Sequence, residues 1–311
     1  MNEFETLQQL QCGKLTPVQA TANFVALIKA GRHLDDHVLK DALKLLPFPQ
    51  YMEIILACIE NGYLSIDVQR GFDELSNSEF KQVVLPLINT WKGGLIEMFS
   101  SKILSLPEDD CYDILFAFVD KGKGLMLPQD LEPKLFSFTA EKRKQILILY
   151  FRYNRRIWWY DSRVAFFNLP LDELRQISWI YNRVCHLRPE DEELLKLDER
   201  SEEERNQLLY PPKPSSWDEA TQNMIDVLHA GGYLYATEEE ALLTRAPKDC
   251  RDKVLHVYHE MRAHFTKQTL ETIQNFPPEL RAELEQSTEY NDILQRSEQR
   301  VKAEEELLKG L

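Results

Sequence analysis

Residues 17–47 read PVQATANFVALIKAGRHLDDHVLKDALKLLP, and this stretch determines the fold that the sequence predicts. Proline suits the first position of a helix, which needs no N–H donor, so a helix is expected to begin at Pro17. Apolar residues then recur with helical period at Phe24, Leu27 and Ile28. Gly31 ends this helix, because glycine adopts a left-handed C-terminal cap at low cost. A second amphipathic segment follows over residues 36–46, so the stretch predicts two helices joined by a turn.

The same pattern recurs along the first two-thirds of the chain. Apolar residues just after a turn recur at a nearly constant interval, at Leu34, Leu64, Leu95, Leu125, Ile157 and Leu187. Residues suited to a helix start recur at the same interval, at Pro17, Pro47, Asn77, Pro107, Thr139 and Pro170. Two registers with one common period indicate an internal structural repeat.

Each repeat is expected to contain two helices of about 12 residues, each about 18 Å long. Later units carry apolar stripes of the same kind, at Ile55, Cys58, Ile59, Leu115, Phe118 and Val119. One hairpin cannot bury its own apolar face, so successive hairpins must stack. We therefore predict an all-α protein in which about six hairpins of about 31 residues form a right-handed α-solenoid over residues 1–200. A smaller helical module follows. An irregular helical bundle is the alternative.

The hairpin resembles repeats of known helical proteins. The residues Leu27-Ile28-Lys29-Ala30-Gly31-Arg32, with Asp35-Asp36 and Ala42-Leu43 after them, read like a pentatricopeptide hairpin. The order of glycine, apolar residue, short helix and Leu-Pro is similar to the mTERF repeat. This resemblance is one of form and covers less than two-thirds of the chain. It implies a helical-hairpin repeat fold and, because proteins of these families bind RNA or DNA, a nucleic-acid partner.

The overall charge favours a different partner. The chain of 311 residues carries 51 Asp and Glu against 37 Lys and Arg, a formal net charge of −14. An acidic surface repels phosphate groups, which disfavours nucleic acid and anionic membranes. The longest apolar run, residues 146–151, is far shorter than the ~20 residues of a membrane span. The opening residues MNEFETLQQLQCGKL do not read as a secretory signal. We expect a cytoplasmic protein without a membrane span.

Positive charge is concentrated in one block. Residues 142–188 contain ten Lys and Arg against three Asp and Glu, a local charge of +7, and the block is rich in aromatic residues. Arginine binds phosphate through paired N–H donors, and aromatic rings stack on bases. Both residue types also anchor protein interfaces. The predicted binding site for an anion or a partner comprises Arg152, Arg155, Arg156, Trp158, Trp159, Arg163, Arg175 and Arg183.

Two alternatives give this basic block a structural role. Its aromatic rings would fill the core between hairpins, with arginine stems covering them through cation–π contacts. The acidic stretch over residues 190–204 would neutralise its charge within the molecule.

A boundary is expected near the proline run Pro211-Pro212-Lys213-Pro214, because proline at this density stops a helix and favours an extended linker. We predict a repeat array over residues 1–200, a charged and proline-rich linker over 201–215 and a helical module over 216–311. Within this module, one helix is expected over residues 248–275 and one long final helix from Pro278 onward.

The last residues carry a second resemblance. Glu304-Glu305-Glu306, followed by Leu307-Leu308-Lys309-Gly310-Leu311, resembles the glutamate-rich carboxyl-terminal signal of Dot/Icm type IV secreted effectors of intracellular bacteria. This resemblance implies translocation into the cytosol of a host cell. A solvated, glutamate-rich helix end is the alternative.

The common motifs of catalysis and cofactor binding are absent from the sequence. The sequence has no Walker loop, GxGxxG, GxSxG, kinase set or HExxH. His256, His259 and Glu260 share a helix face without a matching set elsewhere, so neither a metal nor a cofactor is expected. Cys185 and His186 are neighbours in sequence, which does not make a catalytic pair. The five cysteines are scattered without a CxxC pair, which predicts no disulfide framework.

Three functions follow from these patterns. The first is a non-enzymatic interaction protein, a scaffold or adaptor, that binds a partner protein. The second is binding of nucleic acid or another phosphorylated ligand on the surface of residues 142–188. The third is an enzyme whose active site is assembled from dispersed residues.

Overall fold

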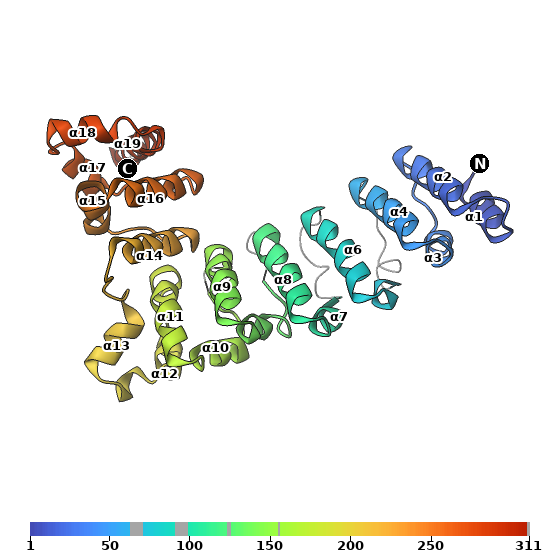
Figure 1. Cartoon of the computed structure of the whole chain (residues 1–311), viewed down its shortest axis with the longest axis horizontal. Coiled ribbons are helices and arrows are strands. Elements are labelled where there is room, and N and C mark those ends of the chain that lie inside the picture. The colour runs from blue at the N-terminus through green and yellow to red at the C-terminus, as the bar shows by residue number, and fades with distance from the viewer. Residues whose placement is uncertain (63–70, 91–98, 123–125, 155, 310–311) are drawn as a thin grey trace. The chain divides into compact units, whose positions relative to one another are not determined.

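The computed structural model describes residues 1–62, 71–90, 99–122, 126–154 and 156–309 (Figure 1). Every regular element within these ranges is a helix, so the prediction of an all-α protein is confirmed. No helix in the same ranges is long and apolar enough to cross a membrane. The chain divides into an N-terminal unit, Met1–Lys134, and a C-terminal unit, Leu135–Leu311.

The N-terminal unit is a row of long helices linked by shorter elements. Along the chain these are α1 (Glu3–Gln11), α2 (Pro17–Lys29), α3 (Asp36–Leu45), α4 (Phe48–Glu60), the 3-10 helix η1 (Gly71–Glu74), α6 (Asn77–Thr90), α7 (Ser100–Leu104) and α8 (Glu108–Gly122). Helix α2 packs on α4, α4 on α6 and α6 on α8, so that the long helices lie side by side (Figure 1). A further 3-10 helix, η3 (Glu132–Ser137), spans the division between the units.

The C-terminal unit begins with the same kind of packing. Its helices are α9 (Ala140–Asn154), α10 (Tyr160–Phe167), α11 (Leu171–Cys185), α12 (Pro189–Leu194), η4 (Leu197–Glu199), α13 (Glu202–Leu209), α14 (Trp217–His229), α15 (Ala236–Arg245), α16 (Lys248–Glu260), α17 (Lys267–Ile273), α18 (Pro278–Leu284) and α19 (Thr288–Lys309). Helix α11 packs on α9 and α13, and α14 packs on both α9 and α11. Helix α16 then packs between α14 and α19.

The predicted helix starts are confirmed. Pro17 and Asn77 are the first residues of their helices, and Pro47, Pro107, Thr139 and Pro170 come directly before theirs. The predicted apolar stripes form the core, because Phe24, Ile28, Ile55, Cys58, Ile59, Leu115, Phe118 and Val119 are buried. Only Leu27 in those stripes is half-buried. Local capping and apolar period therefore determine where the long helices begin and which face they bury.

Where the structure describes the whole second element of a repeat, that element is shorter than the expected ~12 residues. Helix α3 has 10 residues and α10 has 8, and η3 and α12 have 6 each. In the repeats that begin at Pro47 and Asn77, this segment includes residues 63–70 and 91–98, which lie outside the described residues. Pro133 explains the case of η3, because a proline in the middle of the expected ~12-residue helix removes an N–H donor and its ring clashes with the preceding turn. The predicted turn residues Leu64, Leu95 and Leu125 lie outside the described residues.

Left-handed backbone recurs in register with the repeat. Gly31 has φ 76°, Gly62 has φ 68° and His186 has φ 58°. Gly31 and Gly62 stand one repeat apart, and His186 follows Gly31 by a whole multiple of the same step. The same geometry returns at Gly231 (φ 75°) and Arg262 (φ 51°), which are again separated by one such step. A left-handed residue thus follows the long helix at a fixed place in the pattern.

Two predicted helices near the C-terminus are each divided in two. The helix expected over residues 248–275 breaks after α16, where Arg262 is left-handed and Thr266 caps α17 by accepting the N–H of Thr269. The helix expected from Pro278 ends at Leu284, and α19 begins at Thr288. Ser287 Oγ accepts the N–H of Tyr290 at 3.2 Å, which caps α19.

The proline run Pro211-Pro212-Lys213-Pro214 has no regular structure. Helix α13 lies within the expected linker, and both flanking segments belong to the C-terminal unit. The boundary over residues 201–215 stays a prediction.

Gly232 provides a test of the packing between α14 and α11. A Cβ atom on Gly232 would lie 2.8 Å from Val227 Cγ1, 3.1 Å from the Val227 carbonyl oxygen and 3.2 Å from Val184 Cγ2. We expect Gly232→Ala to lower the free energy of unfolding by about 1–3 kcal/mol, because the backbone must shift to accept the methyl group. Urea denaturation followed by far-UV circular dichroism measures the change. Gly71→Ala is the control, since no atom of the described residues lies within 4 Å of its Cβ position. Equal stability of the two variants would contradict the packing.

Candidate functional site

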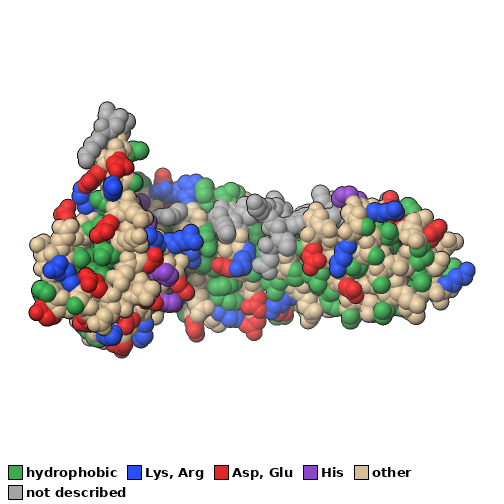
Figure 2. Space-filling view, turned by 90° about the horizontal axis from the view of Figure 1, so that it is seen from above, with side chains coloured by type: hydrophobic (Ala, Val, Ile, Leu, Met, Phe, Trp, Pro, Cys, Tyr) green, Lys and Arg blue, Asp and Glu red, His purple; other side chains and the backbone are tan. Residues whose placement is uncertain are grey.

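The cations of the basic block are mostly paired with carboxylates of the same chain. Ion pairs join Arg143 to Glu173 at 2.7 Å, Lys144 to Asp226 at 2.6 Å, Arg163 to Asp191 at 3.0 Å, Arg175 to Asp172 at 3.5 Å, Arg183 to Glu238 at 2.5 Å and Arg188 to Asp191 at 3.4 Å. At least six of the ten cations are therefore neutralised within the molecule. Figure 2 shows acidic and basic side chains distributed together over the face in view.

Two carboxylates of the segments after the block are buried against it. Asp191, in α12, is fully buried, and both Arg163 and Arg188 reach it. Asp226, in α14, is also buried and pairs with Lys144 of α9. A buried carboxylate is costly unless a cation and hydrogen bonds compensate it, so these pairs connect α12 to α10 and α14 to α9.

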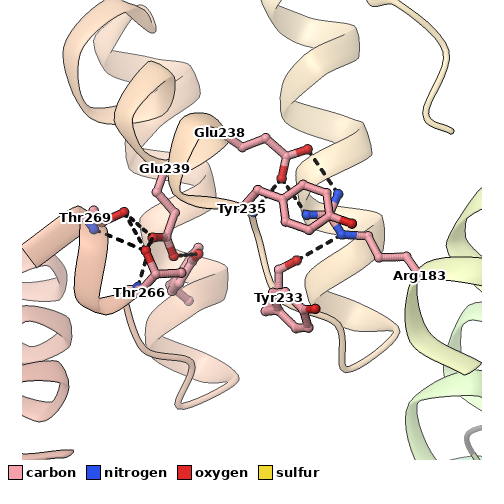
Figure 3. A network of polar contacts seen from close by, with 8 residues as sticks. Arg183, Tyr233, Tyr235, Glu238, Glu239, Thr266 and Thr269 are labelled. Carbon is pink, nitrogen blue, oxygen red and sulfur yellow. Dashed lines mark hydrogen bonds and ion pairs between the residues drawn. The ribbon is translucent and has the colours of Figure 1, made fainter. Parts of the chain in front are cut away.

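Arg183 makes the densest set of contacts (Figure 3). Its Nε donates to the Tyr233 carbonyl oxygen at 3.0 Å, and its two terminal nitrogens donate to the two carboxylate oxygens of Glu238, Nη1 at 3.0 Å. Its guanidinium lies 3.9 Å from the centroid of the Tyr235 ring. The side chain of Arg183 is only 5% exposed. Arg183 therefore fixes the loop 230–235 and the start of α15 to α11.

Glu239 points the other way from its neighbour Glu238 (Figure 3). Its fully buried carboxylate accepts hydrogen bonds from Tyr258 Oη at 2.7 Å, from the N–H and Oγ1 of Thr266 at 2.9 Å each, and from Thr269 Oγ1 at 2.5 Å. Burial raises the pKa of Glu239, although these four donors counteract the rise. The carboxylate joins α15 to α16 and to the first turn of α17.

Arg152 lies beside the same loop. A Cβ atom on Gly231 would lie 3.4 Å from Arg152 Cα, so the end of α9 contacts the turn after α14. Burial lowers the pKa of His229; Asp226 opposes this shift and Arg152 adds to it. The Arg152 guanidinium lies 5.1 Å from the ring centroid of Tyr153. Arg152 and Arg183 thus both lie beside the segment of residues 229–238.

The other predicted site residues lie elsewhere in the C-terminal unit. Arg156 stacks on Trp158, 3.3 Å from the ring centroid, and both residues are exposed. Trp159 is half-buried, and its carbonyl oxygen accepts the N–H of Arg163 at the start of α10. Arg175 precedes Arg183 on α11 by two helical turns, about 12 Å along the helix. Arg155 lies outside the described residues.

The residues that sequence reasoning missed surround an apolar groove beside Arg183. This groove, of about 210 Å³, lies between α11, α14 and residues 211–214. Its walls include Trp179, Pro211, Met224, Val227 and Leu234. Tyr233 and Tyr235 flank Leu234 and are 57% and 51% exposed. The signal in the sequence was Gly231-Gly232-Tyr233-Leu234-Tyr235, which occupies the place of Gly31 to Asp35 in the first repeat.

The structure gives no indication of a metal or disulfide centre. Within the ranges described, no group of three or more His, Cys, Asp or Glu side chains is arranged to hold a metal ion. His256 and His259 instead face carboxylates of α19, and His259 Nδ1 lies 2.9 Å from Asp292 Oδ2. All five cysteines are free.

No family model, curated protein or solved structure matches this chain.

Arg183 and Glu238 are expected to be strongly coupled, because the pair is bidentate, largely buried and stacked on Tyr235. A double-mutant cycle with Arg183→Met and Glu238→Gln, measured by urea denaturation, should give a coupling energy of about 1–3 kcal/mol. The exposed pair Arg300–Glu304, at 2.8 Å, is the control and should give no more than about 0.5 kcal/mol. Equal coupling in the two pairs would contradict a structural role for Arg183.

Glu239 is expected to make stability depend on pH. Because burial raises its pKa in the folded state, the folded protein holds the proton more tightly than the unfolded chain. The free energy of unfolding should therefore fall as the pH rises from the ordinary glutamate value through the raised pKa. Glu239→Gln should remove this contribution and, by leaving buried donors without a charged acceptor, cost about 1–3 kcal/mol at neutral pH.

The measurement is the difference in unfolding free energy between wild type and Glu239→Gln from about pH 4 to about pH 8. This interval covers the ordinary and the raised pKa values of carboxylates. Glu240→Gln, on the exposed side of α15, is the control and should leave the pH profile unchanged. A constant difference between wild type and Glu239→Gln across this range would contradict the expectation.

Proposed function

We propose that this protein is a non-enzymatic helical-repeat protein, a scaffold or adaptor, that binds a partner protein. In this proposal the stacked hairpins form a right-handed α-solenoid over residues 1–200. The common register of helix starts and left-handed turns supports the repeat, as does the packing of each long helix on the next within the units. Residues 216–311 form the module that follows the linker 201–215.

The observation that carries the proposal is the apolar groove with its exposed tyrosines. Tyr233 and Tyr235 expose more than half of their surface beside a groove lined by Met224, Val227 and Leu234. Tyrosine combines a large apolar ring with a polar end, which suits an interface that is exposed in the free protein and buried in the complex. The neighbouring Arg183 is already paired, so the groove offers apolar contact more than positive charge.

The second candidate function is binding of nucleic acid or another phosphorylated ligand. The observation in its favour is that the guanidinium groups of Arg152 and Arg156 contact aromatic rings, whereas six other cations of the block pair with carboxylates. A stacked guanidinium still presents N–H donors to phosphate. The third candidate function is an enzyme, and the buried Glu239 is the best candidate for its catalytic group. Its four hydrogen bonds, however, join α15 to α16 and α17.

The proposed site of action is the cytoplasm, with translocation into a host cell as an extension of the proposal. The end of α19 suits a recognition signal, because Leu307 and Leu308 are 70% and 71% exposed beside the glutamates of 304–306. A secretion machinery would reach this end without unfolding the helices that α19 packs on.

The proposal predicts that Met224→Glu abolishes partner capture. A carboxylate in the apolar groove would have to be desolvated by the partner, so at least a tenfold loss is expected, about 1.4 kcal/mol. Immobilised wild type, exposed to extract in 0.15 M salt, should retain one protein in stoichiometric amount, and Met224→Glu should not. Val18→Glu places the same charge on an exposed apolar residue of α2 and should retain it.

A different result would replace the proposal. If no protein is captured, and a labelled 20-nucleotide RNA or phosphoinositide vesicles bind in a salt-dependent manner, the second candidate is favoured. That binding should then be lost in Arg152→Glu/Arg156→Glu.

A further inference from the structure

The segment after the basic block exposes a series of carboxylates. Seven side chains on α12, η4 and the first turn of α13 are exposed and form no ion pair with any described residue: Glu190, Glu192, Glu193, Asp198, Glu199, Glu202 and Glu203. Two carboxylates differ. Asp191 is buried against Arg163 and Arg188, and the half-buried Glu204 accepts hydrogen bonds from Ser201 at the start of α13. The basic block therefore neutralises one carboxylate of this segment and leaves seven facing solvent.

Nearby cations do not compensate these carboxylates. Arg188 pairs with Asp191, and Arg200 donates its Nε–H to the Leu195 carbonyl oxygen at 2.8 Å. Residues 189–214 contain nine Asp and Glu against four Lys and Arg, a local charge of −5. The surface of this segment is thus strongly acidic next to the proline run.

An open groove of about 680 Å³ lies along this surface. Glu202 and Glu203 line one part of it, and Tyr210, Pro211 and Pro212 line another. Tyr210 is 59% exposed. The groove shares Pro211 and Pro212 with the apolar groove described above, so the proline run separates the two.

One polar atom in the groove lacks a partner. The Oε1 atom of Gln207 is buried and accepts no hydrogen bond from the part of the chain that the structure describes. Gln207 and Asn206 both line the groove. A buried acceptor without a donor is costly, so a rotation of the Gln207 side chain that brings this atom to an N–H group of a ligand would be favoured.

Each wall of the groove matches a feature of a basic peptide. Carboxylates bind Lys and Arg side chains, and the face of a tyrosine ring attracts a guanidinium. Proline and tyrosine surfaces pack against an extended chain, and a side-chain amide bonds to its backbone. Phosphate-bearing ligands are repelled by the same carboxylates.

We propose that this groove, formed by α13 and residues 210–213, binds an extended, arginine- or lysine-rich segment of the partner protein. This inference rests on the proposed function, since it names the chemistry of the partner. Glu202 and Glu203 pair with its basic side chains, the Tyr210 ring stacks on a guanidinium, and the Gln207 side chain rotates so that its Oε1 accepts a backbone N–H. The basic segment reaches the apolar groove across the proline run.

The test is a binding titration with a fluorescein-labelled nona-arginine peptide, followed by fluorescence anisotropy on the full chain. We expect saturable binding that weakens as the salt concentration rises from about 0.05 M to about 0.5 M, because salt screens the attraction between opposite charges. Glu202→Gln/Glu203→Gln should raise Kd about tenfold or more. Tyr210→Ala should raise it about threefold or more, and Tyr210→Phe should retain wild-type affinity, because the ring provides the contact.

A matched control separates the groove from net charge. Glu271→Gln/Glu279→Gln removes the same two charges from exposed positions on α17 and α18 and should change Kd by less than about twofold. An equal loss in both double variants, or no loss in Glu202→Gln/Glu203→Gln, would overturn the inference. Circular dichroism checks that each variant is folded.

The two proposals fail in different ways. If Met224→Glu abolishes capture of a partner but nona-arginine does not bind, the protein-binding function stands and the basic segment is wrong. If nona-arginine binds through Glu202 and Glu203 but no protein is captured, the groove is real and the proposed function fails.

Discussion

The hydrogen bonds and ion pair of Arg183 connect helices that lie far apart in the sequence. Arg183 stands near the end of α11, yet its partners are the Tyr233 carbonyl oxygen, the Tyr235 ring and the Glu238 carboxylate, 50 to 55 residues later. A guanidinium with so little exposure is stable only when acceptors bind its N–H donors. The loop 230–235 must therefore lie where its backbone and the start of α15 supply those acceptors. Glu239, the next residue, then fixes α17 from the other side of α15. The helices after the proline run are thus attached to the earlier ones through polar groups as much as through apolar packing.

The same principle explains the distribution of charge. The ten cations of the basic block look like an anion site in the sequence, but Asp191, Asp226 and Glu238 use four of them to join later helices to earlier ones. Buried charges are retained only where partners compensate them, which removes these cations from the set available to a ligand. Because the compensating carboxylates are few, most of the acidic residues remain on the surface. The net charge of −14 is therefore mainly a surface property, and it repels phosphate while attracting basic partners.

Sequence reasoning succeeded where structure depends on local chemistry. Pro47, Thr139 and Pro170 come directly before helices, because the residues that favour a helix start act within a few positions of it. The regular recurrence of left-handed turns follows from a local rule of the same kind. It failed for short second elements such as η3, where a proline interrupts the amphipathic pattern. It also failed to show which of the predicted site residues are paired within the chain and which are available to a ligand. Arg163 and Arg183 find their partners 28 and 55 residues away, and no periodicity records which carboxylate a given arginine will meet.

Two adjacent grooves of different character suit a division of roles in binding. Exposed carboxylates act over a Debye length of about 8–10 Å, so they attract a basic segment before contact and set the rate of association. Apolar groups such as the half-buried Met224 and the exposed Tyr233 act only on contact, but burial of apolar and aromatic side chains supplies most of the binding energy at an interface. The proline run between the grooves has a restricted backbone, so the two would keep a fixed spacing when a partner binds. Specificity would then come from a partner that presents basic and apolar residues at that spacing, a requirement that neither groove imposes alone.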